Sequence, residues 1–356
     1  MPVIDADAHV VESDRTWDYM DQSDMQFRPT LMGSADSGRQ FWFIDGKIRG
    51  LARSVLSVKK LEDISQVTGR NVVTTQAARD MEDIEGRLQH MDELEIDVQV
   101  LHSTIFIQQI ADRPEVEVAV CRAYNRWLAD IWRQGKGRLR WSAALPFMAM
   151  DEALKELRTA VENGTCGAAV RPIEGDRLPT DPYFFPIYEE ASRLNVPIVF
   201  HIGNANPENC DLVSQYNNGG SFWKFRLPTV GAFHSLLMAG IPDAFPKLRF
   251  GFVEASSQWV PYVVSDLRRR FPGSGRKFPD NPLREYRMYV TCQTDDDLEL
   301  VLRYAGEDNL MIGTDYGHTD QSSEIESIRH LRENGDINPS AINKMLDDNP
   351  RALYNL

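Results

Sequence analysis

The stretch VIDADAHV (residues 3–10) places two aspartates and a histidine on alternate positions of a strand-like segment: Asp5, Asp7 and His9. Side chains of a strand alternate between its two faces, so these three are expected on one face, with alanine and valine on the other. Two carboxylates and an imidazole on a buried face are costly unless a positive charge lies among them. A metal ion would supply that charge, and its remaining ligands must come from elsewhere in the chain.

Beyond this stretch, short β-rich runs alternate with amphipathic helical segments. In residues 114–132, for example, Val116, Val120, Tyr124 and Trp127 keep helical spacing behind a proline. Strands that alternate with helices predict a parallel sheet, and eight such units favour an α/β fold of the (β/α)₈ barrel type. An open doubly wound sheet is the competitor, but no G-x-G-x-x-G follows the first strand. The predicted strands are residues 2–9, 98–102, 138–146, 166–172, 196–201, 248–254, 287–293 and 309–315.

The connection after the first strand is too long for an ordinary loop. Residues 12–78 include RQFWFIDGKIRG (39–50), which predicts a small hairpin around Asp45 and Gly46. We therefore expect residues 1–356 to form a single barrel domain, with residues 12–78 as an inserted cap over one end. A second long connection, residues 203–227, is polar with embedded aromatic residues.

Composition narrows the class of protein. A chain of 356 residues suits one barrel with insertions. The net charge of -14, without a Lys/Arg-rich run, argues against nucleic acid or an anionic membrane as partner. Four scattered cysteines, no signal peptide and no bilayer-length apolar run predict a cytoplasmic protein with reduced thiols. No serine nucleophile elbow, P-loop or kinase motif is present.

Polar residues end most of the predicted strands. In (β/α)₈ barrels the active site lies at the C-terminal ends of the strands, so these side chains are expected to converge. Imidazole and carboxylate ligands with open positions suit Zn²⁺, Mn²⁺ or Fe²⁺ better than Ca²⁺. The strand-ending residues are Asp7, His9, His102, Arg171, His201, Glu254, Gln293 and Asp315.

Four segments carry a family resemblance: DADAH (5–9), VPIVFHIG (196–203), FPKLRFGFVEASSQWVPY (245–262) and LMIGTDYGH (310–318). Together they resemble the amidohydrolase-related family that includes aminocarboxymuconate semialdehyde decarboxylase and γ-resorcylate decarboxylase. The resemblance implies a distorted (β/α)₈ barrel that holds a single divalent metal. The ligand positions that it implies are Asp7, His9, His201 and Asp315.

The sequence departs from the family pattern at two positions, one of them a ligand position. The family has His or Glu where this chain has Asp7, which favours a harder metal such as Mn²⁺ and leaves Zn²⁺ open. The residue after the sixth strand is often a histidine that acts as acid or base in the family, and here it is Glu254. Glu254 and Asp315 are the acid–base candidates. Asp5 is expected to support the ligands from the same strand face.

Other candidates each have two interpretations. His234, in GAFHSLLMAG (231–240), is a catalytic residue or a histidine packed on the barrel exterior. His318 either orients the eighth-strand aspartate or lines the pocket, and His102 is expected to contact substrate. Arg171 binds a substrate carboxylate or forms a structural ion pair. Trp223 lines the pocket or anchors its loop.

These residues favour an enzyme that acts on a small molecule. The first hypothesis is a carboxy-lyase that decarboxylates an aromatic or unsaturated acid without an organic cofactor. The second is a hydrolase in which the metal activates water to cleave a C–N, C–O or C–C bond. A barrel that binds a small molecule without catalysis is the third, and the complete ligand set argues against it. We expect a homo-oligomer, a dimer or a tetramer.

Overall fold

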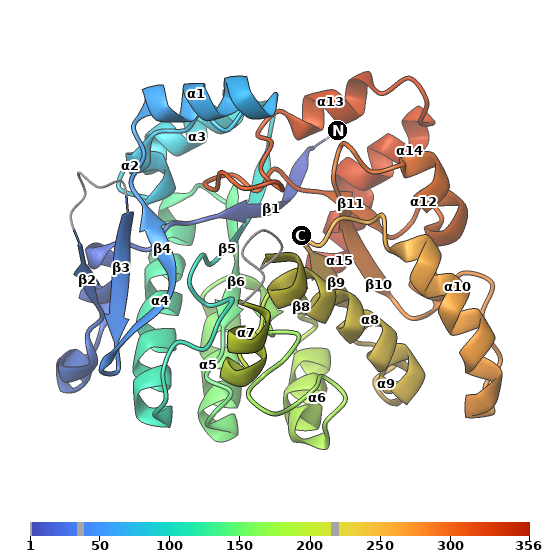
Figure 1. Cartoon of the computed structure of the whole chain (residues 1–356), viewed down its shortest axis with the longest axis horizontal. Helices are drawn as coiled ribbons and strands as arrows, with labels where there is room; N and C mark the ends of the chain where they lie inside the picture. The colour runs from blue at the N-terminus through green and yellow to red at the C-terminus, as the bar shows by residue number, and fades with distance from the viewer. Residues whose placement is uncertain (1, 34–38, 215–220) are drawn as a thin grey trace.

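Eight parallel strands form a nearly closed barrel surrounded by helices, in a computed structural model that describes residues 2–33, 39–214 and 221–356 (Figure 1). Each strand is hydrogen-bonded to the next along the chain. This order confirms the predicted barrel, because a doubly wound sheet reverses its strand order near the centre. The barrel strands are β1 (Ile4–His9), β5 (Val98–His102), β6 (Leu139–Ala144), β7 (Thr165–Ala169), β8 (Ile198–His201), β9 (Phe250–Val253), β10 (Met288–Cys292) and β11 (Leu310–Ile312).

The barrel closes between β1 and the residues that follow β11. The backbone N–H of His9 donates to the carbonyl of Tyr316 at 2.8 Å, and the N–H of Asp315 donates to the carbonyl of Asp7 at 2.8 Å. The last strand of the barrel ends at Ile312, earlier than the end predicted at residue 315. Asp315 lies in the turn beyond it, at the C-terminal mouth of the barrel.

Helices cover the outside of the barrel. Helix α4 begins at Pro114, whose missing N–H costs nothing in the first turn, and it buries the apolar positions that the sequence pattern predicts. Within the described ranges, no helix combines the length and apolarity needed to cross a bilayer. The helices are α1 (Val58–Thr68), α2 (Gln76–Arg79), α3 (Ile84–Glu93), α4 (Pro114–Gln134), α5 (Met150–Glu162), α6 (Phe185–Arg193), α7 (Pro207–Val213), α8 (Leu227–Ala239), α9 (Ile241–Ala244), α10 (Val260–Arg270), α11 (Pro282–Glu285), α12 (Leu298–Ala305), α13 (Ser327–Glu333), α14 (Pro339–Asn343) and α15 (Asn349–Tyr354).

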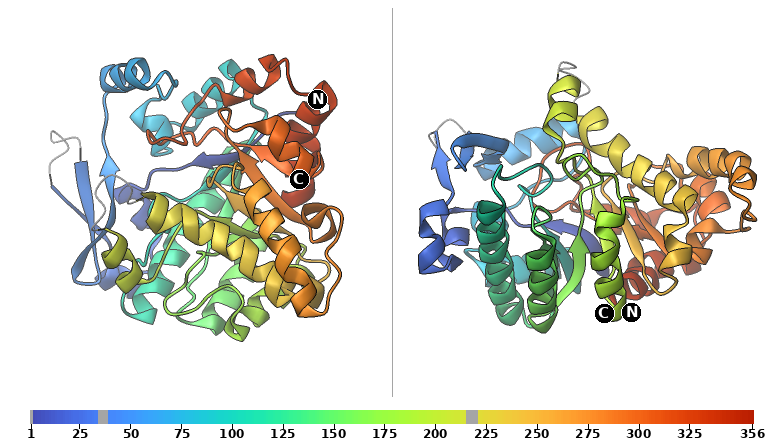
Figure 2. Two further views of the ribbon diagram at one scale, coloured as in Figure 1. Left: turned by 45° about the vertical axis from the view of Figure 1, so that its right-hand side comes forward. Right: turned by 90° about the horizontal axis from the view of Figure 1, so that it is seen from below.

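Helix α15 closes the end of the barrel opposite the mouth. Leu353 and Tyr354 pack against the inward side chains of the strands, among them Ile4 and Ala6, and the Tyr354 hydroxyl donates to the Ala6 carbonyl at 3.1 Å. Figure 2 shows the two ends of the chain near each other. Since apolar side chains fill this end, the polar strand ends at the other end are left to form a site.

Strand β1 contains a bulge, which corrects the expected alternation of its side chains. Its pairing with β5 shifts register between Asp5 and Ala8. Ala6 packs inside the barrel, whereas the Asp5 carboxylate accepts a hydrogen bond from Gln99, whose amide also binds helix α3 on the outside. Asp5 therefore faces the helices, and the extra residue of the bulge turns Asp7 inward. The two aspartates do not share a face.

The insertion at residues 12–78 contains the predicted hairpin. Asp45 and Gly46 have φ of 54° and 75°, the left-handed pair that a two-residue type I′ turn requires. Trp42 is buried, and its ring meets that of Trp17 edge-on at 5.5 Å. The insertion comprises the 3₁₀ helices η1 (Asp14–Tyr19) and η2 (Gln22–Phe27), the antiparallel strands β2 (Thr30–Met32), β3 (Arg39–Ile44) and β4 (Lys47–Ser54), and helices α1 and α2.

Gly313→Ala is expected to force the barrel seam apart. A Cβ at Gly313 would lie 2.2 Å from the Cβ and 3.0 Å from the Cα of Asp7, so the backbone of β1 must shift. Overpacking of this kind lowers the free energy of unfolding by about 1–3 kcal/mol, measurable by urea denaturation. The control is Gly231→Ala on α8, where a new Cβ would have no described atom within 4 Å apart from its chain neighbours and the backbone of its own helix. Its better helix propensity should raise the free energy of unfolding by about 1 kcal/mol. Wild-type stability in Gly313→Ala would contradict the tight seam.

Candidate metal centre

Five side chains converge at the mouth, in or just beyond four of the barrel strands. His9 and His201 face each other with 3.1 Å between their Nε2 atoms. Asp7 and Asp315 place an Oδ1 atom 3.4 Å and 3.3 Å from His9 Nε2, and Glu254 Oε2 lies 2.9 Å from His201 Nε2. Their ligand atoms form two overlapping groups that could hold a cation: Asp7, His9, His201 and Glu254, and His9, Glu254, Asp315 and His318.

The chemistry of this cluster fits a divalent metal. All five residues are buried, and among the described residues no hydrogen-bond partner reaches Asp7 Oδ1. Burial lowers the pKa of His9 well below its ordinary value, so its imidazole is neutral, as metal ligation requires. Three carboxylates and two imidazoles that point at one another out of water are unfavourable without a cation between them. Each of the four ligands expected from the sequence lies in the cluster.

Two of the carboxylates sit on strained backbone. Glu254 has φ of 67° and Asp315 has φ of 49°, left-handed values that cost a residue with a side chain about 1–3 kcal/mol. The backbone N–H of Glu254 is held by the Thr291 hydroxyl at 2.9 Å. This conformation ends each strand abruptly and directs the side chain across the mouth. Nothing in the sequence pattern predicted it.

His318 buttresses Asp315 from the rim of the site. Its Nδ1 lies 2.8 Å from Asp315 Oδ1, and its Nε2 lies 2.8 Å from the hydroxyl of Thr104. That hydroxyl donates its proton to the Val10 carbonyl at 2.7 Å, so it accepts from Nε2, and both ring nitrogens carry protons. Burial disfavours this charge, but Asp315 outweighs burial and raises the pKa of His318 to about 9. Ser323, which the sequence analysis missed, donates to Asp315 Oδ2 at 2.6 Å.

Two cavities adjoin the cluster. The outer cavity is lined by Glu254, His201 and His318 at the metal side and by Phe225 and Leu56 on its walls. The inner cavity lies behind His201, towards β5, β6 and β7. The two cavities share three lining residues, Ile107, His201 and Ile202.

The structure places the other predicted site residues apart from the cluster. Arg171 lines the inner cavity, but its guanidinium pairs with Glu174 at 2.5 Å and with Glu117 at 3.1 Å, the structural alternative for this residue. His234 lies on α8, outside both cavities, with its Nε2 3.2 Å from Asp266. Trp223 belongs to a π-helical turn, Phe222–Arg226, and is half exposed.

His102 and Asp5 stand one step from the cluster. His102 lines the inner cavity, and its ring centroid lies 5.1 Å from that of His201. Burial lowers the pKa of His102 to about 4, so its ring is neutral. Asp5 supports the site from the outer face of β1: its carboxylate accepts the N–H of Asp7 at 3.2 Å and the hydroxyl of Thr314 at 2.6 Å. Residues 215–220 of the second long connection lie outside the described residues.

A parallel (β/α)₈ barrel with buried imidazoles and carboxylates converging at its C-terminal mouth has the architecture of a metal-dependent enzyme. The chain belongs to the amidohydrolase family, whose model matches residues 4–356, and this confirms the resemblance found in the sequence.

Three known proteins are similar to this chain. The 2-amino-3-carboxymuconate-6-semialdehyde decarboxylase of Dictyostelium discoideum is 24% identical over 265 residues, 69% of this chain and 71% of that protein. The γ-resorcylate decarboxylase of Rhizobium radiobacter is 27% identical over 254 residues, 65% of this chain and 75% of that protein. A dihydroxybenzoic acid decarboxylase structure from Polaromonas sp. JS666, with bound manganese and 2-nitroresorcinol, superposes with a TM-score of 0.68 at 20% identity, covering 100% of this chain and 97% of that one.

We predict about one equivalent of divalent metal per chain, held by Asp7, His9, His201 and Asp315. Elemental analysis of protein purified with added Mn²⁺ or Zn²⁺ should find it in the wild type and lose it in His9→Ala/His201→Ala. His234→Ala is the matched control, because that imidazole contacts Asp266 away from the cluster, and it should retain the metal. Metal retained by the double variant would refute the ligand assignment.

Glu12 generates a pH-dependent prediction. Its carboxylate accepts the N–H of Thr104 at 3.2 Å, and burial raises its pKa from 4.5 to about 8. Between these values native Glu12 keeps a proton that the unfolded chain releases, so this group makes stability fall as pH rises. Glu12→Gln removes this loss of unfolding free energy, which is on the order of 1 kcal/mol per pH unit.

Urea denaturation at about pH 5 and about pH 8 checks this prediction. The stability of Glu12→Gln relative to the wild type should rise with pH, while Glu62→Gln on the exposed side of α1 should follow the wild type. Parallel profiles for Glu12→Gln and the wild type would show that Glu12 has an ordinary pKa.

Proposed function

We propose that this protein is a metal-dependent, non-oxidative decarboxylase of an aromatic or unsaturated carboxylic acid. Both curated relatives are named decarboxylases of unsaturated or aromatic acids, and each match spans about two thirds of this chain. The observation that carries the proposal is the position of Glu254. Its buried carboxyl group belongs to the cluster and also lines the outer cavity, where it can give a proton to a bound substrate.

The metal would be held by Asp7, His9, His201 and Asp315. When bound, it supplies positive charge that attracts the carboxylate and a neighbouring hydroxyl or carbonyl oxygen of the substrate. His318 holds Asp315 through its Oδ1 atom and Ser323 through its Oδ2 atom.

Glu254 is the proposed acid. Burial raises its pKa, whereas the proximity of His201 and the charge of a bound metal oppose that rise; the proposal requires burial to prevail, so that the carboxyl group keeps a proton. In the reaction, Glu254 gives this proton to the substrate carbon that bears the carboxylate. The bond from that carbon to the carboxylate then breaks, its electron pair returns to the ring or the conjugated system, and CO₂ leaves. Glu254 remains as a carboxylate and is reprotonated from solvent.

Manganese is the metal we favour over zinc, because carboxylates supply much of the site and Mn²⁺ prefers oxygen ligands. The manganese in the Polaromonas structure supports this choice.

We further propose that residues 12–78 cap the mouth, since Leu56 from this insertion lines the outer cavity. A homo-oligomer is supported by the exposed apolar face of the inserted sheet, where Phe41, Phe43 and Ile48 lie. The four buried free cysteines support a cytoplasmic location.

Glu254→Gln tests the proposed acid. The change keeps the shape and removes the proton, so turnover should fall by roughly two to four orders of magnitude while the metal content stays intact. The assay follows CO₂ release from a panel of hydroxybenzoates, and amine or acid release from the corresponding amides and esters. Glu299→Gln, exposed on α12, is the control and should keep full activity.

Three outcomes would overturn parts of this proposal. Loss of metal from Glu254→Gln would make Glu254 a ligand. Near-normal turnover would remove its role as the acid. Amine or acid release without CO₂ would establish the hydrolase, with Glu254 as the base.

A further inference from the structure

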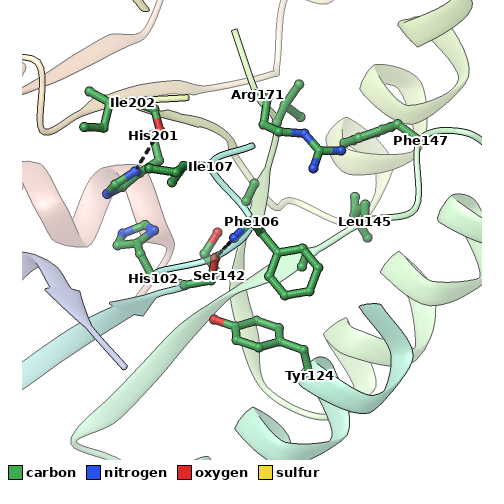
Figure 3. A pocket seen from close by; sticks show the side chains of 14 residues that line it. His102, Phe106, Ile107, Tyr124, Ser142, Leu145, Phe147, Arg171, His201 and Ile202 are labelled. Atoms are coloured by element: carbon green, nitrogen blue, oxygen red, sulfur yellow. Dashed lines mark hydrogen bonds between the residues drawn. The ribbon is translucent and has the colours of Figure 1, made fainter. Parts of the chain in front are cut away.

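Glu254 faces an imidazole whose orientation is fixed. Figure 3 shows the contact that holds the His201 ring: its Nδ1 donates to the carbonyl oxygen of Ile202 at 3.2 Å. The Nε2 atom is left for the cluster, and Glu254 Oε2 lies 2.9 Å from it. Glu254 also lines the outer cavity, unlike the inner cavity drawn in Figure 3. A displacement of Glu254 would therefore separate the proposed acid both from His201 and from a substrate in the outer cavity.

The turn that carries Glu254 has unfavourable backbone at two residues. Glu254 has φ of 67° and Ser256 has φ of 62°, left-handed values that residues with a side chain rarely adopt. The ladder of β9 ends at Val253, so it does not hold this turn. The Thr291 hydroxyl binds only the first N–H of the turn. Contacts from another part of the chain must hold the rest, because an unsupported turn would relax.

Asp296, in the turn after β10, makes these contacts. Its Oδ1 accepts the hydroxyl of Ser256, and its Oδ2 accepts the N–H and the hydroxyl of Ser257 at 2.8 Å and 2.7 Å. Oδ2 also accepts the N–H of Gln293 at 2.9 Å, which fixes the carboxylate within its own turn. One side chain thus ties the turn after β9 to the turn after β10.

The neighbouring acids of the same turn have other partners. Asp297 caps α12, where its carboxylate accepts the N–H of Leu300 at 2.9 Å. Asp295 pairs with Arg70 of the insertion at 2.6 Å. The helix cap and the contact with the insertion are therefore made without Asp296, and the contacts of Asp296 outside its own turn go to the turn that carries the proposed acid.

We infer that Asp296 is a positioning residue for the proposed acid: it holds the turn after β9 so that the Glu254 carboxyl group faces His201 and the outer cavity. Asp296 lines neither cavity, so its effect on the reaction passes through Glu254. The inference rests on the proposed function, which gives Glu254 its role in turnover.

Asp296→Asn tests this role. An amide has one acceptor oxygen and sets an NH₂ group against the other donors, so it cannot accept all four hydrogen bonds. In metal-loaded protein, kcat for CO₂ release from the preferred hydroxybenzoate should fall roughly ten- to a hundredfold, because a misplaced reacting group loses much of its effect. KM and metal content should stay near those of the wild type. Asp297→Asn is the matched control and should keep kcat, since asparagine caps a helix about as well as aspartate.

A double-mutant cycle separates positioning from a structural role. If Asp296 acts through Glu254, Asp296→Asn should not lower kcat further in protein that already carries Glu254→Gln. A loss of folded protein would instead lower kcat by the same factor in both backgrounds. Ser257→Ala is the milder variant if Asp296→Asn folds poorly, because it removes one hydroxyl and keeps the N–H. It should show a smaller fall in kcat with the same dependence on Glu254.

A crystal structure of Asp296→Asn supplies a measurement that does not depend on turnover, and the Glu254 carboxyl group should be displaced from His201. Glu254 in its wild-type position, or an equal fall in kcat in both backgrounds, would overturn the inference. Coupled falls in amine or acid release, without CO₂, would retain Asp296 as a positioning residue and refute the decarboxylase. Wild-type kcat in Asp296→Asn, with a large loss in Glu254→Gln, would do the reverse.

Discussion

The barrel and its site depend on the hydrogen bonds that the Asp5 carboxylate accepts. It accepts hydrogen bonds from the N–H and hydroxyl of Thr314, from the amide of Gln99 and from the N–H of Asp7. One buried side chain therefore ties β1 to β5 on one side and to the residues after β11 on the other. Gln99 in turn accepts from Arg87, a fully buried guanidinium that also donates to the barrel backbone. This network anchors the bulge, and the bulge turns Asp7 inward.

Two of the residues whose carboxylates meet at the mouth also have unfavourable backbone conformations. Glu254 and Asp315 both adopt left-handed φ at the points where their strands end, and both are buried near other carboxylates. A fold retains such costs where the surrounding contacts over-determine them, here through Thr291 and His318. The proposed metal would offset the charge repulsion, so this region should be more stable with the metal bound than without it.

Much of the barrel could be predicted from the sequence, because alternating apolar strands and amphipathic helices are local patterns. The residues that end strands, among them His9 and His201, were found for the same reason. The features that the sequence did not predict depend on contacts between residues far apart in the chain. The bulge that separates Asp5 from Asp7 arises from pairing with β5, and no pattern within β1 encodes it. Arg171 lies beyond the end of β7, and the sequence left open whether it binds substrate or forms an ion pair, because the acids that neutralise it come from α4 and from the loop after β7.

The seam of the barrel has a consequence for how the chain folds. Residues 4–9 form hydrogen bonds with residues 315 and 316 and with Tyr354, which lie more than 300 positions later in the sequence. One edge of the first strand is therefore covered only after nearly the whole chain has been synthesised. Contacts of such sequence separation carry a large loop-closure entropy and slow the search for the native state. During synthesis, β1 would leave the ribosome with an open edge and two acidic side chains lacking their partners. The cluster at the mouth joins residues from both ends of the chain, so it cannot be complete before residue 315 has been synthesised.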